Sequence, residues 1–260
     1  MDGLNCLQSI YKSNEKQEKT MPNWIQNELV AYNLDPRVKT ILEATFKQDD
    51  PFQTICPMPE ILNDTQSPTP YRLREMLGGS SRILAVLDDL SVSSINRKDE
   101  WRQKILEIGV DEMVRRIKED KSIGEHEADE FEFAIRAIAT TGYSNWYDWR
   151  LDNWGVKWDA SEQMLEDEPL FKDESLGNPD LVVTFNTPWG PPTGILQNLT
   201  KQYPEATFIL RWADEDDYGY GQGILYAEAG IVTEREIEDK KEFLKILLGY
   251  CDDEDEDEDE

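Results

Sequence analysis

Histidine and cysteine are nearly absent from this chain of 260 residues, and this scarcity limits the chemistry that it can perform. The one histidine is His126, and the three cysteines, Cys6, Cys56 and Cys251, lie far apart. Zinc sites need several imidazole or thiolate ligands at short spacing, and a serine or cysteine nucleophile needs a neighbouring base. We therefore predict no zinc site, no cofactor and no catalytic residues. We expect reduced thiols and an exposed His126 at the start of a helix.

Long apolar runs are missing as well. No stretch approaches the roughly 18 to 20 apolar residues that span a bilayer. The N-terminus carries no basic segment followed by an apolar one, which is the pattern of a secretory leader. We expect a soluble protein of the cytoplasm that does not bind membranes.

Positive charge is scarce, since 27 Lys and Arg residues face 55 Asp and Glu residues and the net charge is −28. Residues 252–260 are all acidic, and removing these nine charges still leaves −19. Such a field repels nucleic acid and anionic membranes and attracts basic protein surfaces. The tail cannot fold by itself because its like charges repel one another. Two roles stay open for it, namely solubility alone or imitation of a nucleic-acid backbone.

The pattern of the N-terminal half predicts one strand and then helices. Residues 24–32 alternate as a strand does, and Asp35 with Pro36 begins a helix that runs to about residue 46. Residues 47–80 contain many prolines and predict a loop. Apolar residues at helical spacing between residues 98 and 121, and again around Phe131, predict a helical segment that ends near Gly142.

The C-terminal half predicts strands with one helix between them. We expect strands at residues 155–160, 181–187, 207–212 and 222–228, and a helix from Pro191 to about Tyr203. A last helix is predicted from Thr233, because Glu236 three residues later completes a capping box. The buried stripe of this helix would contain Ile237, Leu244 and Leu248. Without the helical segment, the order of elements is that of the split βαβ, ferredoxin-like fold. The expected class is therefore α+β, an antiparallel ferredoxin-like sheet with a large helical insertion.

Four segments share a pattern with a known family. They are MPNW at residues 21–24, PMPEIL at residues 57–62, WGVKW at residues 154–158, and the turn at residues 189–192, which contains Trp189, Pro191 and Pro192. In this combination the chain resembles the YubB/Api-like proteins of bacterial phages and conjugative plasmids, a ferredoxin-like family of unassigned biochemistry. The resemblance implies that MPNW opens the first strand and that WGVKW forms an inner strand. It also implies that the turn after Trp189 leads into the second helix, and that the chain acts in a bacterial host cell.

These patterns together divide the chain into five parts. Residues 1–20 form a polar extension before Met21, which could be the ancestral start, and residues 21–56 form the first βα unit. Residues 57–142 contain the loop and the helical insertion. Residues 143–250 complete the ferredoxin-like domain and add the last helix, and residues 251–260 form a disordered acidic tail.

The acidic turn from Asp214 to Asp217 could bind a cation only weakly. Counted from Asp214 as a helix-loop-helix calcium site, the fifth and twelfth places are Tyr218 and Leu225, where oxygen ligands are needed. The glycines from Gly219 to Gly223 join two strands, whereas a phosphate loop joins a strand to a helix. The turn is therefore predicted to be an exposed hairpin, whose acids repel one another until a basic partner binds.

The tryptophans between residues 146 and 158 could form a stacking platform for single-stranded nucleic acid, as aromatic residues do in other ferredoxin-like modules. Only Arg150 and Lys157 accompany them against Asp148, Asp152 and Asp159, so the basic groove of such a platform is missing. We favour core packing for these rings. Trp189 is different, because it lies on a proline-rich turn where an indole can cover the mouth of a pocket.

Two classes of function follow. The favoured one is a non-enzymatic binding protein of a phage or mobile element, which covers the basic nucleic-acid surface of a host defence protein, as DNA mimics of the antirestriction and anti-CRISPR type do. The alternatives are a metal-dependent enzyme or ligand sensor around Trp189 and the acidic turn, and a phage housekeeping protein that is acidic only for solubility. The oligomeric state is not specified. The predicted partner-binding residues are Asp214, Glu215, Asp216, Asp217, Tyr218, Trp189, Asp252, Asp253, Glu254 and Asp255.

Overall fold

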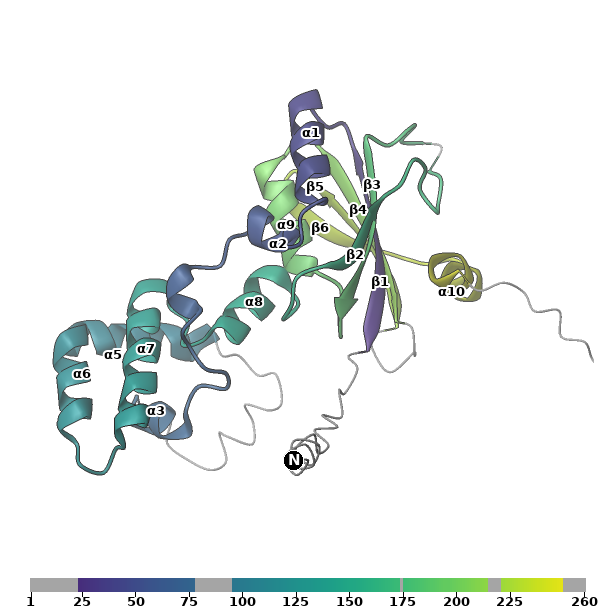
Figure 1. The fold of residues 1–260 in the computed structure, drawn as a ribbon. Coiled ribbons are helices and arrows are strands. Elements are labelled where there is room, and N and C mark those ends of the chain that lie inside the picture. Colours follow the sequence, from purple (N-terminus) through teal and green to yellow (C-terminus); the bar gives the residue numbers. More distant parts are fainter. Residues whose placement is uncertain (1–22, 78–94, 174, 215–220, 250–260) are drawn as a thin grey trace, which may run out of the picture.

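An antiparallel sheet of six strands organises the part of the chain that the structure describes (Figure 1). The structure is a computed structural model, and it describes residues 23–77, 95–173, 175–214 and 221–249. The strand order is β2-β3-β1-β4-β5-β6. The strands are β1 (Trp24–Tyr32), β2 (Ser161–Leu165), β3 (Leu181–Pro188), β4 (Thr207–Asp214), β5 (Gln222–Glu228) and β6 (Ile231–Arg235).

Strand β1 lies at the centre of this sheet, between β3 and β4. Leu29 of β1 is opposite Val183 on one side and Leu210 on the other. The prediction that the N-terminal strand shares a sheet with residues 181–187 and 207–212 is therefore confirmed. The order β2-β3-β1-β4 is that of the ferredoxin-like split βαβ fold, and β5 and β6 extend the sheet beyond β4. The expected α+β class with a helical insertion is confirmed.

The two faces of the sheet are covered by different helices (Figure 1). Helices α1 (Pro36–Thr45), α2 (Pro51–Ile55), α8 (Trp146–Trp154) and α9 (Thr193–Gln202) lie on one face. Their apolar side chains join Leu29, Phe185 and Phe208 of the strands in the main core. Helix α10 (Lys240–Leu248) covers part of the other face, where Phe243 packs with Ala213.

The helical insertion has a hydrophobic core of its own. It contains α3 (Tyr71–Met76), α5 (Ile95–Ile108), α6 (Val110–Glu119) and α7 (Glu125–Thr141), and the short 3₁₀ helix η1 (Glu60–Leu62) precedes it. Ile105, Ile117, Phe131 and Ile135 are almost completely buried in this second core. The predicted end of α7 is correct, because Gly142 adopts the left-handed conformation that closes a helix. Figure 1 shows the insertion beside the sheet, joined to it through α8.

The strand predicted at residues 155–160 is wrong, and so is the inner strand that the resemblance implied for WGVKW. Trp154 ends α8, and Gly155 caps that helix with φ +87°. Strand β2 begins only at Ser161. The helix starts where the Asn145 side chain accepts a hydrogen bond from the backbone N–H of Asp148 at 2.9 Å, a capping pattern hidden among the aromatic residues.

The last helix was predicted to begin too early. Thr233 lies in β6, which forms a hairpin with β5. Ala229 and Gly230, with φ of +50° and +80°, form the two-residue turn of this hairpin. Helix α10 begins at Lys240, where the Asp239 side chain accepts the Glu242 N–H at 3.0 Å. The Thr233–Glu236 spacing resembles a capping box by coincidence.

The loop predicted for residues 47–80 contains short helices that local sequence does not specify. Helix α2 depends on Asp159, about a hundred residues later, for its N-terminal hydrogen bonds. Helix α3 depends on Leu73, which is buried in the core of the insertion. The prolines of this segment lie at or near the ends of the short helices, and for that reason their number predicted a loop.

Candidate functional site

The two tryptophan motifs of the sequence meet in space where α8 packs against the start of α9. A Cβ atom on Gly155 would lie 2.8 Å from the backbone nitrogen of Thr193. A Cβ atom on Gly194 would lie 2.4 Å from the carbonyl oxygen of Asn153. Only glycine permits this approach of the two backbones, so both positions join the end of α8 closely to the beginning of α9.

Trp158 and Trp189 form a partly exposed ring pair beside this junction, which we call the indole pair. Their ring centroids are 5.4 Å apart at an interplanar angle of 44°, and Trp158 is 40% exposed. The Lys157 ammonium lies 3.9 Å from the Trp158 centroid and 3.6 Å from that of Trp189. Partial burial lowers the pKa of Lys157. One cation thus holds both rings by cation–π attraction.

The backbone around Trp189 is fixed in an unusual conformation. Trp189 has φ +60°, a left-handed value that is strained for a residue with a bulky side chain. Its N–H donates to the carbonyl of Asn23 at 2.9 Å, and the Thr187 hydroxyl donates to the carbonyl of Gly190 at 2.7 Å. These bonds hold the turn in place and present the Trp189 ring in one orientation.

Asp159 connects the indole pair to helix α2. Its carboxylate accepts the backbone N–H groups of Phe52 at 2.8 Å, Gln53 at 3.0 Å and Ala160 at 2.9 Å. Burial nevertheless raises the pKa of Asp159 to about 6, against the opposing effect of these three donors, and the neighbouring Asp50 carboxylate raises it further. Asp159 is therefore a structural group that changes charge in the mildly acidic range.

The edge of the sheet next to the indole pair is acidic. Strand β2 pairs with β3 on one side only, and its register is irregular between Ser161 and Met164. Glu162, Glu166 and Asp167 are exposed along and just after this strand, and we call these three residues the acidic edge. No Lys or Arg of the described residues forms an ion pair with any of the three. A cleft of about 420 Å³ lies between this edge and the end of α1.

The tryptophans between residues 146 and 158 do not form a single stacking surface. Trp149 and Trp154 are buried at 7% and 1% exposure, and Trp146 is partly buried against the same core. Arg150 lies over the rings of Trp146 and Trp154, with its Cζ atom 5.3 and 4.6 Å from the two centroids. The interpretation as core packing is confirmed for Trp149 and Trp154. Trp158 does not pack with these rings and instead contacts Trp189.

The structure brings few of the predicted partner-binding residues together. Asp214 is 2% exposed, and its Oδ1 accepts a hydrogen bond from Asn23 at 2.7 Å, so its carboxylate is a buried group and not part of an exposed acidic surface. Its place at the end of β4 explains this, because that strand is central in the sheet. The other predicted residues except Trp189 lie outside the described residues: Glu215, Asp216, Asp217, Tyr218, Asp252, Asp253, Glu254 and Asp255.

Sequence reasoning missed a charged pair on the face of the sheet opposite α1 and α9. Arg211 and Glu28 are opposite each other on β4 and β1, with 2.6 Å between Arg211 Nη1 and Glu28 Oε2. Glu28 is completely buried and Arg211 is 5% exposed. One acidic and one basic side chain inside two mostly apolar strands were the available signal, because a buried charge usually needs a partner.

His126 is an exposed residue at the start of a helix. His126 lies in the first turn of α7, and its exposed ring is 3.5 Å from a carboxylate oxygen of Glu130. Across the part of the chain that the structure describes, no group of three His, Cys, Asp or Glu side chains is arranged to hold a metal ion. No helix among these residues is long and apolar enough to cross a membrane.

Comparison with known proteins supports the family resemblance. Residues 153–259 match a family model described as the ferredoxin-like domain in Api92-like protein, which confirms the resemblance to the YubB/Api-like family. The match includes Trp158, Trp189 and the acidic edge, whereas β1 at the centre of the sheet lies outside it. The crystal structure of a protein api92 from Yersinia pseudotuberculosis covers 84% of this chain and 99% of its own, at 12% identity and a TM-score of 0.37. That similarity is too low to support a geometric argument. No curated protein matches the chain.

Proposed function

We propose that this chain, whose residues 153–259 belong to the ferredoxin-like domain family of the Api92-like proteins, is a binding protein and not an enzyme. Its partner in this proposal is a basic host protein that handles nucleic acid, such as a defence nuclease. The chain would come from a phage or another mobile element and would cover the surface that DNA or RNA uses. The acidic edge beside the indole pair is the observation that carries the proposal.

The net negative charge is concentrated in the C-terminal part of the sequence. Residues 143–260 contain 30 Asp and Glu against 9 Lys and Arg, a net charge of −21 out of the total of −28. Residues 95–141 of the insertion contain 12 acidic and 9 basic residues, a net charge of −3. A basic surface is therefore attracted mainly to the sheet and tail, and much less to the insertion.

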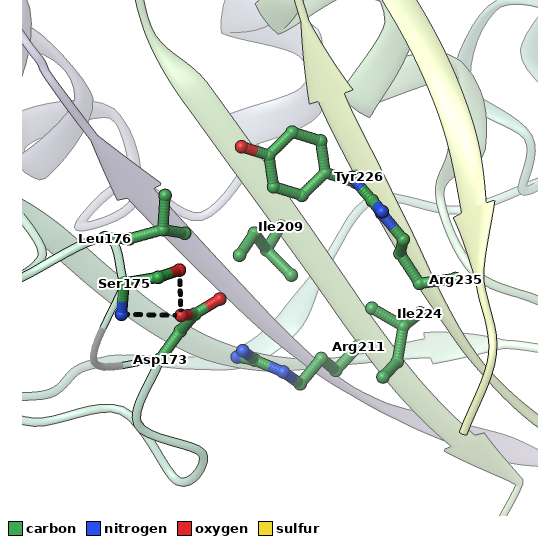
Figure 2. Close-up of a pocket in the computed structure, with 8 residues that line it drawn as sticks. All are labelled: Asp173, Ser175, Leu176, Ile209, Arg211, Ile224, Tyr226 and Arg235. Atoms are coloured by element: carbon green, nitrogen blue, oxygen red, sulfur yellow. Dashed lines mark hydrogen bonds between the residues drawn. The ribbon is translucent and has the colours of Figure 1, made fainter. Parts of the chain in front are cut away.

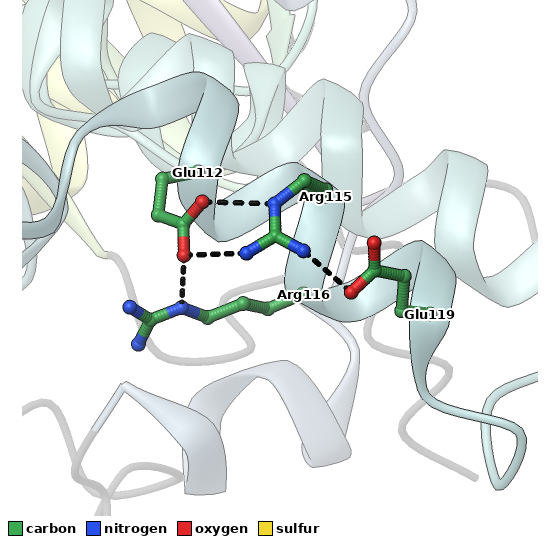
Figure 3. Close-up of polar contacts among 4 residues, drawn as sticks. All are labelled: Glu112, Arg115, Arg116 and Glu119. Atoms are coloured by element: carbon green, nitrogen blue, oxygen red, sulfur yellow. Dashed lines mark hydrogen bonds and ion pairs between the residues drawn. The ribbon is translucent and has the colours of Figure 1, made fainter.

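The acids of the insertion are also largely paired, as Figure 3 shows for helix α6. Glu112 accepts from Arg115 at 2.8 and 2.9 Å and from Arg116 at 2.7 Å, and Glu119 accepts from Arg115 at 2.6 Å. The hydrogen bonds from the two guanidinium groups lower the pKa of Glu112 to about 2. Acids that already have cationic partners attract another protein weakly, whereas the three residues of the acidic edge have no such partner among the described residues.

The indole pair gives this surface an anchor. Energetic hot spots of protein interfaces are enriched in tryptophan and are surrounded by polar residues that exclude water. Trp158 and Trp189 are held rigid by Lys157 and by the turn, so they lose little conformational entropy on binding. Met164, 60% exposed on β2, adds apolar area between the acids.

Competition with nucleic acid tests this proposal. The full chain is immobilised, exposed to a bacterial lysate at low salt, and eluted either with duplex DNA or with rising salt. We expect the retained proteins to be DNA-binding or RNA-binding proteins that duplex DNA displaces, because both ligands would occupy one basic surface. Retained proteins that stay bound at saturating DNA would refute the proposal.

A further inference from the structure

A pocket of about 380 Å³ opens on the face of the sheet that α1 and α9 do not cover (Figure 2). Asp173, Ser175 and Leu176 form one wall from the loop between β2 and β3, and strands β4, β5 and β6 supply the rest. The strand residues of the pocket are Ile209, Arg211, Ile224, Tyr226 and Arg235. We call it the arginine pocket, and its volume is in the range that holds a small ligand.

Arg211 is a rigid, buried cation in the wall of the pocket. Its ion pair with Glu28 fixes one end of the guanidinium, and the Phe171 ring lies 5.2 Å from its Cζ atom. The Leu170 N–H donates to the other oxygen of Glu28 at 2.5 Å, which holds the carboxylate in turn. Figure 2 shows the Arg211 guanidinium extending toward the Asp173 side of the pocket. A guanidinium has five N–H donors, so the bond to Glu28 leaves others for a ligand.

Arg235 adds a second cation that no carboxylate of the described residues neutralises. Its Cζ atom lies 4.7 Å from the centroid of the Tyr226 ring. Stacking engages the face of a guanidinium and leaves the N–H donors in its plane available. The Arg235 side chain is exposed and, among the described residues, has no ion pair with a carboxylate.

Tyr32 packs behind the apolar part of the pocket. Its side chain is 1% exposed and packs in one apolar cluster with Ile209, Leu176 and Tyr226 of the pocket. The Tyr32 hydroxyl has no hydrogen-bond partner among the described residues. Burial raises its pKa, and Arg211 and Asp173 are close enough to affect that pKa in opposite directions. A buried hydroxyl is normally hydrogen-bonded, and Tyr32 packs against the residues of the pocket without being one of those that line it.

We propose that the arginine pocket binds a small organic oxyanion with a flat apolar body and one carboxylate or sulfonate group. Arg235 donates to the oxyanion, the Arg211 guanidinium adds positive charge to the wall of the pocket, and Ile209 and Ile224 contact the apolar body. A single negative charge suits the site, because Glu28 already balances Arg211 and the carboxylate of Asp173 lies at the rim. This inference is independent of the proposed partner, which binds at the opposite edge of the sheet.

A fluorescent probe with this chemistry tests the site. Anilinonaphthalenesulfonate carries an aromatic body and one sulfonate, and phenylnaphthylamine has the same body without the charge. We expect saturable binding of the anionic probe to the full chain and weaker binding of the neutral one. Arg235→Gln should weaken the binding of the anionic probe about tenfold, because a charge-assisted hydrogen bond is lost. The same substitution should leave the affinity for the neutral probe unchanged.

Two further variants separate the pocket from general effects. Lys201→Gln removes one positive charge on α9, on the other face of the sheet, and should change the affinity for the anionic probe less than twofold. Tyr32→Phe should change the affinity for that probe less than twofold, because Tyr32 is not one of the residues that line the pocket, and it should not lower the melting temperature, because the hydroxyl has no partner among the described residues. Equal effects of Arg235→Gln and Lys201→Gln would overturn the proposal. Equal affinity for the two probes would do the same.

Discussion

Single residues show how this chain uses buried charge. Asp159 is held by three backbone donors at the start of α2, and Glu28 is held by Arg211 and the Leu170 N–H. Both carboxylates lie where solvation is poor, so their partners determine what they do to stability. For Asp159 the cost of burial exceeds the effect of the donors and the pKa rises to about 6.

Asp159→Asn should remove the part of the pH dependence of stability that comes from the titration of Asp159. The folded pKa of Asp159, about 6, is above its ordinary value of 3.8, so the folded chain binds this proton more tightly. Its contribution to the free energy of unfolding is therefore complete below pH 4 and is lost as the pH rises through 6. Between pH 4 and 7 the wild type should lose up to about 3 kcal/mol relative to Asp159→Asn. Urea denaturation of both proteins across this range measures the difference, and a constant difference would show that Asp159 titrates normally.

The Glu28–Arg211 pair should behave as a unit. Glu28→Ala leaves the Arg211 guanidinium buried without its partner and should lower the free energy of unfolding by roughly 3 to 5 kcal/mol. The double variant Glu28→Met with Arg211→Met removes both charges and should cost much less, because apolar residues of similar size can replace a buried pair. Chemical denaturation of the two variants tests this. A double variant as unstable as Glu28→Ala would contradict it.

At the scale of elements, the backbones of α8 and α9 approach each other closely at their junction. This junction joins the two tryptophan motifs and places Trp158 against Trp189. The approach of the two backbones is possible because residues 155 and 194 lack a Cβ atom. The aromatic surface thus depends on glycine as much as on tryptophan.

Gly194→Ala should therefore destabilise the chain by about 1 to 3 kcal/mol, the usual cost of overpacking. The added Cβ atom would lie 2.4 Å from a carbonyl oxygen and 2.6 Å from the carbonyl carbon of Asn153, and backbone atoms cannot easily move away. Gly124→Ala is the matched control, because a Cβ atom there meets nothing within 4 Å. Thermal denaturation should show that the control loses at most about 1 kcal/mol of unfolding free energy, which is the cost of losing a glycine N-cap. Equal effects of the two substitutions would argue against a close junction.

Elements with local signals could be predicted from the sequence, and elements with distant partners could not. Strand β1 and helix α1 follow from alternation and from the Asp35–Pro36 start, and Gly142 marks the end of α7. Helix α2 was missed because its capping group, Asp159, is remote in sequence. At the site, Trp189 was recognised from its prolines, but its contact with Trp158 depends on the tertiary junction. The arginine pocket unites side chains from three strands and a loop, so no local pattern shows it.

At the scale of the whole molecule, the helical insertion differs from the rest of the chain in both its core and its charge. The insertion has its own core and acids that pair with arginine and lysine, while residues 143–260 of the sequence carry most of the net negative charge. Exposed acids on an edge strand also discourage pairing with other sheets. The central claim is that the acids of this edge attract a basic partner.

The most direct test of that claim compares two triple variants with the same net charge. Glu162→Gln, Glu166→Gln and Asp167→Asn neutralise the acidic edge, and Asp99→Asn, Glu100→Gln and Glu107→Gln neutralise three exposed acids of α5. Both change the net charge from −28 to −25. Association with a partner that DNA displaces is measured at several salt concentrations. We expect the edge variant to lower the association rate about tenfold at low salt and to weaken its salt dependence, with little effect of the α5 variant. Equal rates for the two variants would contradict the account, because position on the surface would then not matter.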